Sequence, residues 1–199
     1  MALHLKRLRF SGFPSRVHLI GLSIVSASLV VLLMIVGTGV GLATPFGWLH
    51  VHPERPQAPE FVLHDVYGEE LRLSTHRGKI VLVNFWSAWC PPCREEMPEL
   101  QQLWRSLDKS DQFALLAVGI GEDYHSTNLF FHSFPEPLTF TLLPDLANVV
   151  SRQWPMRGLP ASFVLDKDGR IVFSTTTAVR WGDPRMVDAL RRLIAEDGD

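Results

Sequence analysis

The sequence predicts an α/β protein built on a mixed β-sheet, and three observations lead to this fold class. Residues 80–86 form a nearly continuous apolar and β-branched run, which is typical of a central strand covered on both faces. An amphipathic helix and a second buried strand follow, and a strand–helix–strand order requires helices on the faces of the sheet. Asp168-Gly169 then separates two short apolar runs, which is a strong signal for a β-hairpin.

Upstream of the central strand, residues 61–73 are expected to form two short strands that flank a turn at Tyr67-Gly68. A loop is expected at residues 74–78. The central strand itself should end at Ser87-Ala88-Trp89-Cys90.

The helix after the central strand is predicted from about Pro92 to Leu107. Its apolar positions recur at three- and four-residue spacing, at Met97, Leu100, Leu103, Trp104 and Leu107. Pro98 lies inside this pattern and should kink the helix, because proline removes a backbone donor and clashes with the preceding turn. The second buried strand is expected at residues 113–120.

The second half of the chain is predicted to hold two short helices, at 128–134 and 146–154, with a strand at 139–143 between them. The two hairpin strands are expected at 161–165 and 170–175. A final helix should begin after Asp183, with Pro184 in its first turn. Its apolar face consists of Met186, Val187, Leu190, Leu193 and Ile194.

Composition narrows the class of protein. The chain has 199 residues, of which 46% are hydrophobic and 20% charged, with 19 basic and 21 acidic side chains. That balance favours a packed core and argues against long disordered tails and against nucleic-acid binding. Cys90 and Cys93 are the only cysteines, which excludes a framework of several disulfides and a four-cysteine zinc site.

The N-terminal part predicts a membrane anchor. The stretch from Leu19 to Val40 carries no charge, and as an α-helix at ~1.5 Å per residue it is long enough to cross a hydrocarbon core of ~30 Å. The charges before it are all basic, at Lys6, Arg7, Arg9 and Arg16. The positive-inside rule therefore keeps the N-terminus in the cytoplasm and places the rest outside. A secretory signal cleaved after Ala43 is the alternative, and it exports the same part of the chain.

The predicted organisation has four parts. Residues 1–18 are a basic cytoplasmic N-terminus, 19–41 are the transmembrane anchor or cleaved signal, 42–57 are a linker, and 58–199 are the folded domain. The linker is expected to be an extended tether because it is rich in proline, with Pro53 and Pro56 inside it and Pro59 just beyond.

Cys90-Pro91-Pro92-Cys93 is the motif that carries chemistry. It stands where a strand passes into a helix, and the partial positive charge of a helix N-terminus stabilises a thiolate. Cysteines of CxxC motifs in such settings have pKa values of ~3.5 to 7.5, against ~8.5 for a free thiol. Cys90, the first and more exposed, is expected to attack a substrate disulfide, and Cys93 to resolve the mixed disulfide. Neither step needs a metal ion or another cofactor.

Other uses of the two cysteines are less well supported. A c-type haem site needs a histidine directly after the second cysteine, where this chain has Arg94. A zinc site would need two distant histidines, and a structural disulfide across three residues closes too small a loop to stabilise much.

The segment Asn84-Phe-Trp-Ser-Ala-Trp-Cys-Pro-Pro-Cys-Arg-Glu-Glu-Met-Pro98 resembles the active-site segment of thioredoxin-fold proteins, and more narrowly of the membrane-anchored TlpA/ResA/CcmG(DsbE)-like group. The second matching segment is Arg157-Gly-Leu-Pro-Ala-Ser-Phe-Val-Leu-Asp166. The resemblance covers residues 58 to 197 and implies a thioredoxin-like fold for this part. It also implies that Pro160 is a cis-proline facing Cys90 and that the backbone of Leu159 pairs with substrate.

Two positions refine the implied mechanism. Ordinary thioredoxins have a buried aspartate where this chain has Asn84, so another acid must handle the proton of Cys93. By resemblance that acid is Glu96, with its pKa raised by partial burial. The alternative is that Glu96, like Glu95 and Glu99, only complements the helix dipole.

Side chains around the cysteines are expected to bind substrate. Trp86 and Trp89 flank the motif and are expected to pack beside it and to shape an apolar docking surface. The candidate substrate-binding residues are Trp89, Pro91, Pro92, Leu159 and Pro160.

These observations predict a single-pass protein of the bacterial inner membrane whose catalytic domain lies in the periplasm. The expected activity is thiol–disulfide exchange, with reduction of disulfides in selected exported proteins such as apocytochrome c. Since that compartment is oxidising, the resemblance implies a membrane thiol reductant of the DsbD or CcdA type as partner. The alternatives are a disulfide oxidase or isomerase that uses the same motif, and a non-catalytic binding module.

Overall fold

The computed structural model describes residues 47, 49–107 and 111–196. The described residues all belong to one compact unit of the chain. The predicted anchor, residues 19–41, lies outside the described residues. Among the residues that are described, no helix is both long and apolar enough to span a membrane.

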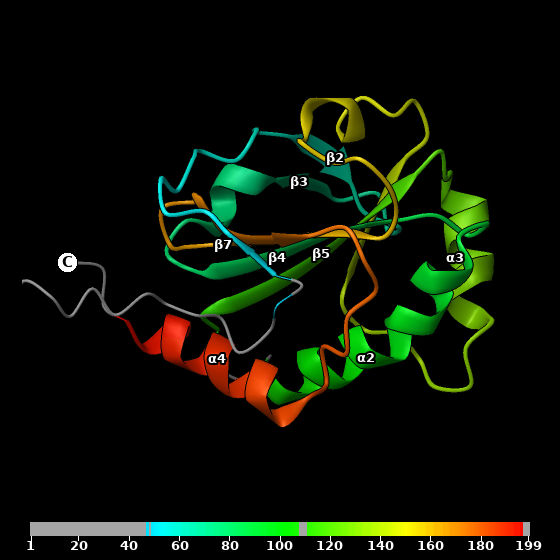
Figure 1. Cartoon of the computed structure of the whole chain (residues 1–199). Coiled ribbons are helices and arrows are strands. Elements are labelled where there is room, and N and C mark those ends of the chain that lie inside the picture. Colours follow the sequence, from blue (N-terminus) through cyan, green and yellow to red (C-terminus); the bar gives the residue numbers. More distant parts are fainter. Residues whose placement is uncertain (1–46, 48, 108–110, 197–199) are drawn as a thin grey trace, which may run out of the picture. The chain divides into compact units, whose positions relative to one another are not determined.

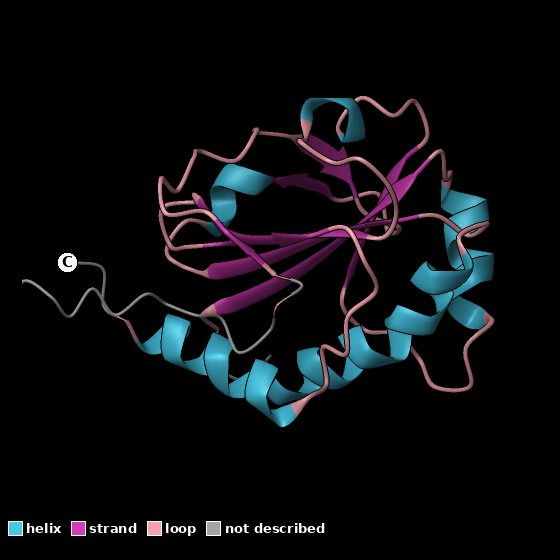
Figure 2. Ribbon diagram, in the orientation of Figure 1, coloured by secondary structure: helices cyan, strands magenta, loops and turns pink. Residues whose placement is uncertain are grey.

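A six-stranded mixed sheet forms the centre of the described unit (Figures 1 and 2). The strand order is β1-β8-β7-β4-β5-β6. Strands β4, β5 and β6 run parallel, while β7 is antiparallel to β4 and β8 is antiparallel to β7. The predicted fold class, an α/β fold on a mixed sheet, is confirmed. The strands are β1 His50–Val51, β4 Ile80–Trp86, β5 Phe113–Ile120, β6 Thr141–Asp145, β7 Ala161–Leu165 and β8 Ile171–Thr175.

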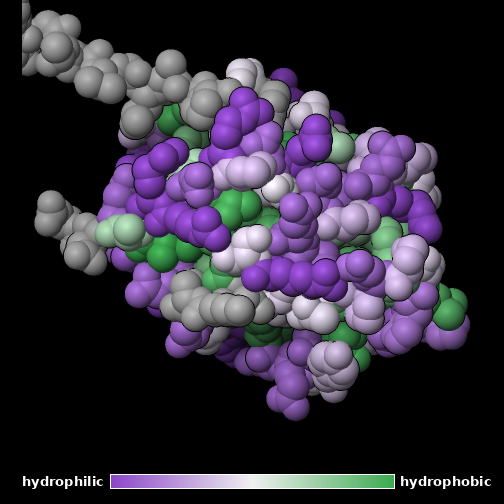
Figure 3. Space-filling view, turned by 90° about the horizontal axis from the view of Figure 1, so that it is seen from below, coloured by the Kyte–Doolittle hydropathy of each residue, from purple (hydrophilic) through white to green (hydrophobic). Residues whose placement is uncertain are grey.

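The helices are α2 Pro91–Leu107, α3 Tyr124–His132 and α4 Pro184–Ala195. Helices α2 and α4 lie along one face of the sheet, below it in Figure 1. Their apolar side chains, such as Leu100 and Leu190, join Leu82 and Leu115 of the sheet in one buried cluster. Seen from the α2 and α4 side, the surface is mostly hydrophilic with scattered apolar areas (Figure 3). The two helices therefore turn apolar faces inward and polar faces outward, as the spacing of their apolar residues predicts.

The opposite face of the sheet is covered by a small hairpin and connecting segments. The hairpin strands, β2 Val62–His64 and β3 Glu70–Arg72, pair with each other and form the predicted turn around Gly68, whose φ is 87°. A 3-10 turn at Leu73–His76 follows, where the sequence predicts a loop. A second buried cluster fills this face, with Phe61, Phe85 and Trp154 among its members.

The predicted strands at 113–120 and 161–165 and the C-terminal helix are confirmed with the same or nearly the same bounds. Helix α2 continues from Pro91 through Pro98 to Leu107. Helix α3 begins at Tyr124, earlier than the predicted residue 128. Asp123 caps it, accepting from the Ser126 backbone N–H at 2.7 Å, and this capping box sets the start.

The predicted helix at 146–154 is wrong. Only a 3-10 turn at Ser151–Gln153 forms there. The carboxylate of Asp145 accepts hydrogen bonds from the N–H groups of Val149, Val150 and Ser151 at 2.8, 3.2 and 3.0 Å. These bonds take up backbone donors and fold the segment into a loop, so the apolar spacing does not become a helix.

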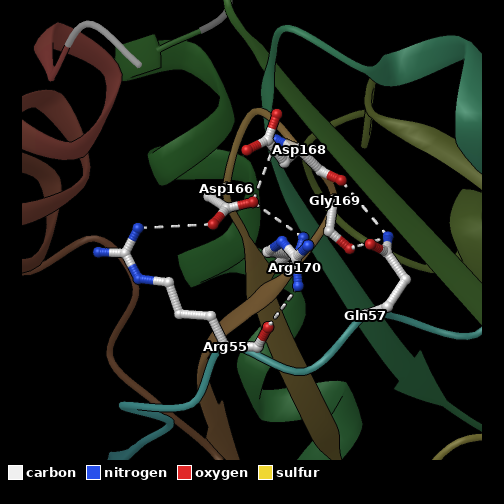
Figure 4. Close-up of polar contacts among 6 residues, drawn as sticks. All are labelled: Arg55, Gln57, Asp166, Asp168, Gly169 and Arg170. Atoms are coloured by element: carbon white, nitrogen blue, oxygen red, sulfur yellow. Dashed lines mark hydrogen bonds and ion pairs between the residues drawn. The ribbon is translucent and has the colours of Figure 1, made fainter. Parts of the chain in front are cut away.

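The predicted linker at 42–57 is too long, because its last part belongs to the sheet. Strand β1 pairs with β8, and Gln57 forms an isolated bridge with Arg170. Figure 4 shows the polar contacts beside this bridge. Arg55 lies 3.6 Å from the carboxylate of Asp166, and the Gln57 side chain donates to Gly169 O at 3.0 Å. The folded unit therefore begins before residue 58.

Candidate active site

Cys90 and Cys93 form a disulfide at the N-terminal end of α2, with Cα atoms 5.3 Å apart. The Cys93 N–H donates to Cys90 Sγ at 3.3 Å, so the first sulfur already faces a donor in the first turn of the helix. The Cys90 N–H donates to Ser87 O at 3.1 Å. The predicted placement of the motif at a strand-to-helix junction is confirmed.

Solvent exposure differs among the side chains in and around the cysteine motif. Cys90 is 3% exposed and Cys93 0%, so Cys90 is only marginally the more open of the two. Trp89 is 74% exposed, and Pro91 and Pro92 are also exposed. The packing role predicted for Trp86 is confirmed, because Trp86 is fully buried and stacks on the ring of Phe130. A side chain buried in this way does not contribute to an exposed docking surface.

Glu96 lies one helical turn beyond Cys93 and points into the protein, where it is 2% exposed. Its Oε1 accepts from the Trp181 indole N–H and from the Val179 N–H, the latter at 3.2 Å, and its Oε2 accepts from Asn84 Nδ2 at 3.3 Å. Burial raises the pKa of Glu96 to about 7, although all three hydrogen bonds favour the ionised form and act the other way. A solvated acid that only complements the helix dipole would not be buried in this way.

Asn84, which stands where thioredoxins have an aspartate, is fully buried on β4. Its Nδ2 also donates to Ser162 Oγ at 2.9 Å, so it joins Glu96 to strand β7. The amide oxygen of Asn84 has no hydrogen-bond partner among the described residues.

The peptide bond between Leu159 and Pro160 is cis, as the resemblance implies. Phe85 of β4 pairs with Ala161 of β7, so Pro160 comes directly before the residue that is paired at the end of β4. The same end of β4 leads into the cysteine motif. Sheet register therefore brings the cis-proline loop and the motif to one edge, and Leu159 there is half-buried.

Three contributors to the site were not found from the sequence: Val179, Trp181 and Glu122. Val179 and Trp181 lie more than eighty residues from Glu96, so no local pattern connects them. Glu122 is buried and accepts from Ser87 Oγ and the Ala88 N–H, both at 2.8 Å. An acidic residue two positions after a buried strand is a weak signal that could have pointed to Glu122.

Metal-binding geometry is not found in the described part of the chain, where no three His, Cys, Asp or Glu side chains cluster.

Comparison with known proteins is consistent with this geometry. The AhpC/TSA family model matches residues 55–174, more than half of the chain. A thiol-disulfide oxidoreductase ResA from Geobacillus kaustophilus is 40% identical over 114 residues, which cover 57% of this chain and 64% of that protein. The chain thus matches less than two thirds of that relative's length. A ResA from Bacillus anthracis is 31% identical over 147 residues, covering 72% of this chain and 83% of that protein.

Solved structures show the same fold. A Chlorobium tepidum protein described as a thiol:disulfide interchange protein DsbE is 27% identical with a TM-score of 0.59, covering 70% of this chain and 94% of that one. A Bacteroides thetaiotaomicron protein described as a protein disulfide isomerase is 25% identical with a TM-score of 0.65, covering 71% and 90%. The chain therefore belongs to the AhpC/TSA family of thioredoxin-like proteins and, within it, to the TlpA/ResA/CcmG-like group.

Proposed function

We propose that this chain is a membrane-tethered thiol-disulfide oxidoreductase that reduces disulfides in exported proteins. The observation that carries the proposal is the Cys90–Cys93 disulfide at the start of α2, where the Cys93 N–H points at Cys90 Sγ. A donor and a helix dipole at that sulfur stabilise the thiolate, which is the species that attacks disulfides.

The reaction needs two exchange steps. In the reduced protein the Cys90 thiolate attacks one sulfur of a substrate disulfide, forms a mixed disulfide and releases the other substrate sulfur as a thiolate. Cys93, as a thiolate, then attacks Cys90 Sγ, which restores the Cys90–Cys93 disulfide and releases the second substrate thiolate. The protein dithiol loses two electrons, the substrate disulfide gains them, and two protons pass from the protein thiols to the released thiolates.

Glu96 is proposed to take up and return the proton of the cysteine pair. A carboxyl group with a pKa of about 7 changes its protonation state near neutral pH, where proton transfer to and from a thiol is useful. Replacing Glu96 with Gln should shift the pH dependence of Cys90 and Cys93 alkylation. An alkylation profile equal to that of the unmodified protein would contradict this role.

Substrate is proposed to dock on the exposed side chains of Trp89, Pro91 and Pro92. The backbone of Leu159, directly before the cis-proline, would pair with an extended segment of the substrate, as in strand addition. Apolar contact and backbone pairing together would position a client disulfide without selecting one sequence.

Cellular placement and partners are part of the proposal. The uncharged stretch from Leu19 to Val40 and the basic residues before it support an inner-membrane anchor with the catalytic unit in the periplasm. A reductase in that oxidising space must be recharged, which supports a membrane thiol reductant of the DsbD or CcdA type. Apocytochrome c is the client suggested by resemblance to the group.

The test uses insulin as a disulfide substrate and the full chain in detergent. The reduced protein should reduce insulin, Cys90→Ser should abolish the reaction, and Cys93→Ser should trap a mixed disulfide that dithiothreitol releases. Cys90 and Cys93 are the only cysteines in the sequence, so no third thiol can substitute for either. Insulin reduction that persists in Cys90→Ser would contradict the role proposed for Cys90, and a parent protein that does not reduce insulin would favour a non-redox role.

A further inference from the structure

Glu122 is a buried carboxylate that the proposed exchange steps do not use. It is 6% exposed and lies two residues after the end of β5. Its Oε1 accepts from Ser87 Oγ and from the Ala88 N–H, each at 2.8 Å. Both donors belong to the turn between β4 and α2, so a single carboxylate oxygen ties that turn to the neighbouring strand.

The tied turn leads directly to the reacting sulfur. The Cys90 N–H donates to Ser87 O, so a displacement of Ser87 is passed to the backbone of Cys90. Cys90 Sγ in turn accepts from the Cys93 N–H at 3.3 Å, a contact that depends on where the Cys90 backbone lies. Two consecutive hydrogen-bonded links therefore connect Glu122 to Cys90, and a third holds the Cys90 sulfur to the backbone of Cys93.

Gly119, which has no side chain, leaves space for the side chain of Glu122. A Cβ atom placed on Gly119 would lie 3.0 Å from Glu122 Cβ and 3.1 Å from the Trp86 ring, closer than ordinary van der Waals contact. The Glu122 N–H also donates to Gly119 O at 3.3 Å. Glycine at this position lets the carboxylate side chain pack across the strand end, so both the backbone and the side chain of Glu122 are held in place.

We propose that Glu122 is a positioning residue for thiol–disulfide exchange, which holds the Ser87–Ala88 turn so that Cys90 Sγ stays aligned with the N-terminus of α2. The inference rests on the proposed function, because exchange is the reaction that this alignment serves. The N–H at the helix N-terminus stabilises the thiolate only while the sulfur remains in front of it. A displacement of ~1 Å at a reacting atom can lower a rate by about 100-fold.

The experiment compares Glu122→Ala with a matched control, Asp145→Ala. Asp145 is a second buried carboxylate at the end of the neighbouring strand β6, and it accepts from three backbone N–H groups of its own loop. Its loss should reduce stability in a comparable way, but none of these bonds reaches the Ser87–Ala88 turn. Both changes are made in the full chain in detergent, with Cys93→Ser added for alkylation so that Cys90 alone reports.

The first readout is the rate of alkylation of Cys90 by iodoacetamide as a function of pH. Glu122→Ala should slow alkylation at neutral pH by ~10- to 100-fold and move the half-maximal rate to higher pH, because the thiolate loses its aligned donor. Asp145→Ala should stay within about 3-fold of the parent protein, because the hydrogen bonds of the Asp145 side chain go to Val149, Val150 and Ser151 and not to the Ser87–Ala88 turn. Equal slowing in both variants, or a parent-like profile in Glu122→Ala, would overturn the proposal.

Milder variants keep the test decisive if Glu122→Ala does not fold. Glu122→Gln retains an acceptor oxygen and should keep at least about a third of the parent rate, because a neutral hydrogen bond is weaker but still present. Ser87→Ala removes one of the two donors and should fall between Glu122→Gln and Glu122→Ala. A Glu122→Gln protein as slow as Ser87→Ala or slower would contradict a role based on hydrogen bonding.

Insulin reduction by the same variants, with Cys93 restored, separates the two proposals. If the parent chain does not reduce insulin, the proposed function fails, while the alkylation profiles still decide the role of Glu122. If the parent is active and Glu122→Ala alone loses activity at equal stability to Asp145→Ala, both proposals are supported.

Discussion

At the scale of single residues, Glu96 shows burial and hydrogen bonding acting in opposite directions on one carboxyl group. Burial raises its pKa to about 7, whereas the donors on Trp181, Val179 and Asn84 lower it. Burial has the larger effect, so the folded protein holds the proton on Glu96 to higher pH than the unfolded chain does.

This difference predicts a pH-dependent stability. In the unfolded chain Glu96 ionises near its ordinary pKa of 4.5, and in the folded protein near a pKa of about 7. The folded state binds more protons between these values, so the free energy of unfolding should fall as pH rises through this window, by about 3 kcal/mol from this group. Glu96→Gln should remove that part of the pH dependence.

Urea unfolding of the oxidised protein, followed by tryptophan fluorescence at about pH 4 and about pH 8, measures the effect. Glu95→Gln is the control, because Glu95 is the exposed neighbour on the same helix turn. If Glu96→Gln and Glu95→Gln keep the same pH dependence as the parent protein, the burial argument is wrong.

Site residues that lie close together in the sequence, or within a short recognisable segment, could be predicted from the sequence. Cys90, Cys93 and Glu96 follow one another at three-residue steps, and Pro160 lies in a short matching segment. Side chains that reach the site from distant segments could not be predicted, because their position depends on tertiary packing. Trp181 comes from the segment before α4, and Glu122 reaches the motif only because β4 and β5 are neighbours.

At the scale of elements, strand β1 shows how a proline-rich segment can join the sheet. His50 and Val51 pair with β8, and the His52 N–H donates to Val172 O at 2.9 Å. The His52 ring also lies 2.8 Å from Ser174 Oγ. The number of prolines predicted a tether here, but His50, Val51 and His52 lie before Pro53 and keep the backbone N–H groups that pairing with β8 requires.

A chain that begins at Pro56 should therefore be less stable than one that begins at Thr44. It loses the pairing of β1 with β8 and also two hydrogen bonds of His52, and since these two bonds alone contribute about 1 kcal/mol each, the free energy of unfolding should fall by at least about 2 kcal/mol. Urea midpoints of the two proteins measure the difference. Since β8 and β7 separate β1 from β4, the reduction potential should be the same in both.

Equal urea midpoints would show that β1 contributes nothing to the fold. A reduction potential that changes with the truncation would contradict the expectation that β1 and the Cys90–Cys93 site are independent.

Helices and strands whose own residues carry the full pattern of apolar side chains were predicted well. The buried run of β4 and the apolar face of α4 need no information from elsewhere in the chain. The segment after β6 was not predicted, since the carboxylate of Asp145 competes for its backbone donors. The hairpin β2–β3 was expected, but its packing on the sheet face opposite α2 depends on side chains of the second buried cluster from other segments, such as Phe85 and Trp154, and could not be deduced from its own residues.

At the scale of the whole molecule, topology gathers the site at one edge of the sheet. Strands β4, β5 and β6 are parallel, so their carboxyl ends meet at that edge, where β4 leads into Cys90 and β5 into Glu122. Strand β7 is antiparallel to β4 and starts there, directly after Pro160. The order of the strands, more than any one segment, brings these residues together.

The orientation in the membrane is predicted from charges that lie outside the folded unit. Alkaline phosphatase fused to the C-terminus should be active in intact bacteria, because that enzyme needs disulfides formed outside the cytoplasm. Replacing the four basic residues with glutamine should reduce its activity, because the proposed topology assigns them the orientation of the anchor; these are Lys6, Arg7, Arg9 and Arg16. An inactive fusion of the natural sequence would contradict the proposed topology.

The reduction potential of the Cys90–Cys93 pair tests the central claim most directly. The full chain in detergent is equilibrated with thiol buffers of defined potential, and the fraction oxidised is read from tryptophan fluorescence. If the protein reduces exported proteins, its reduction potential should lie near that of thioredoxin, about −270 mV. A value of about −120 mV, typical of a disulfide donor, would contradict the account and assign electron flow in the opposite direction.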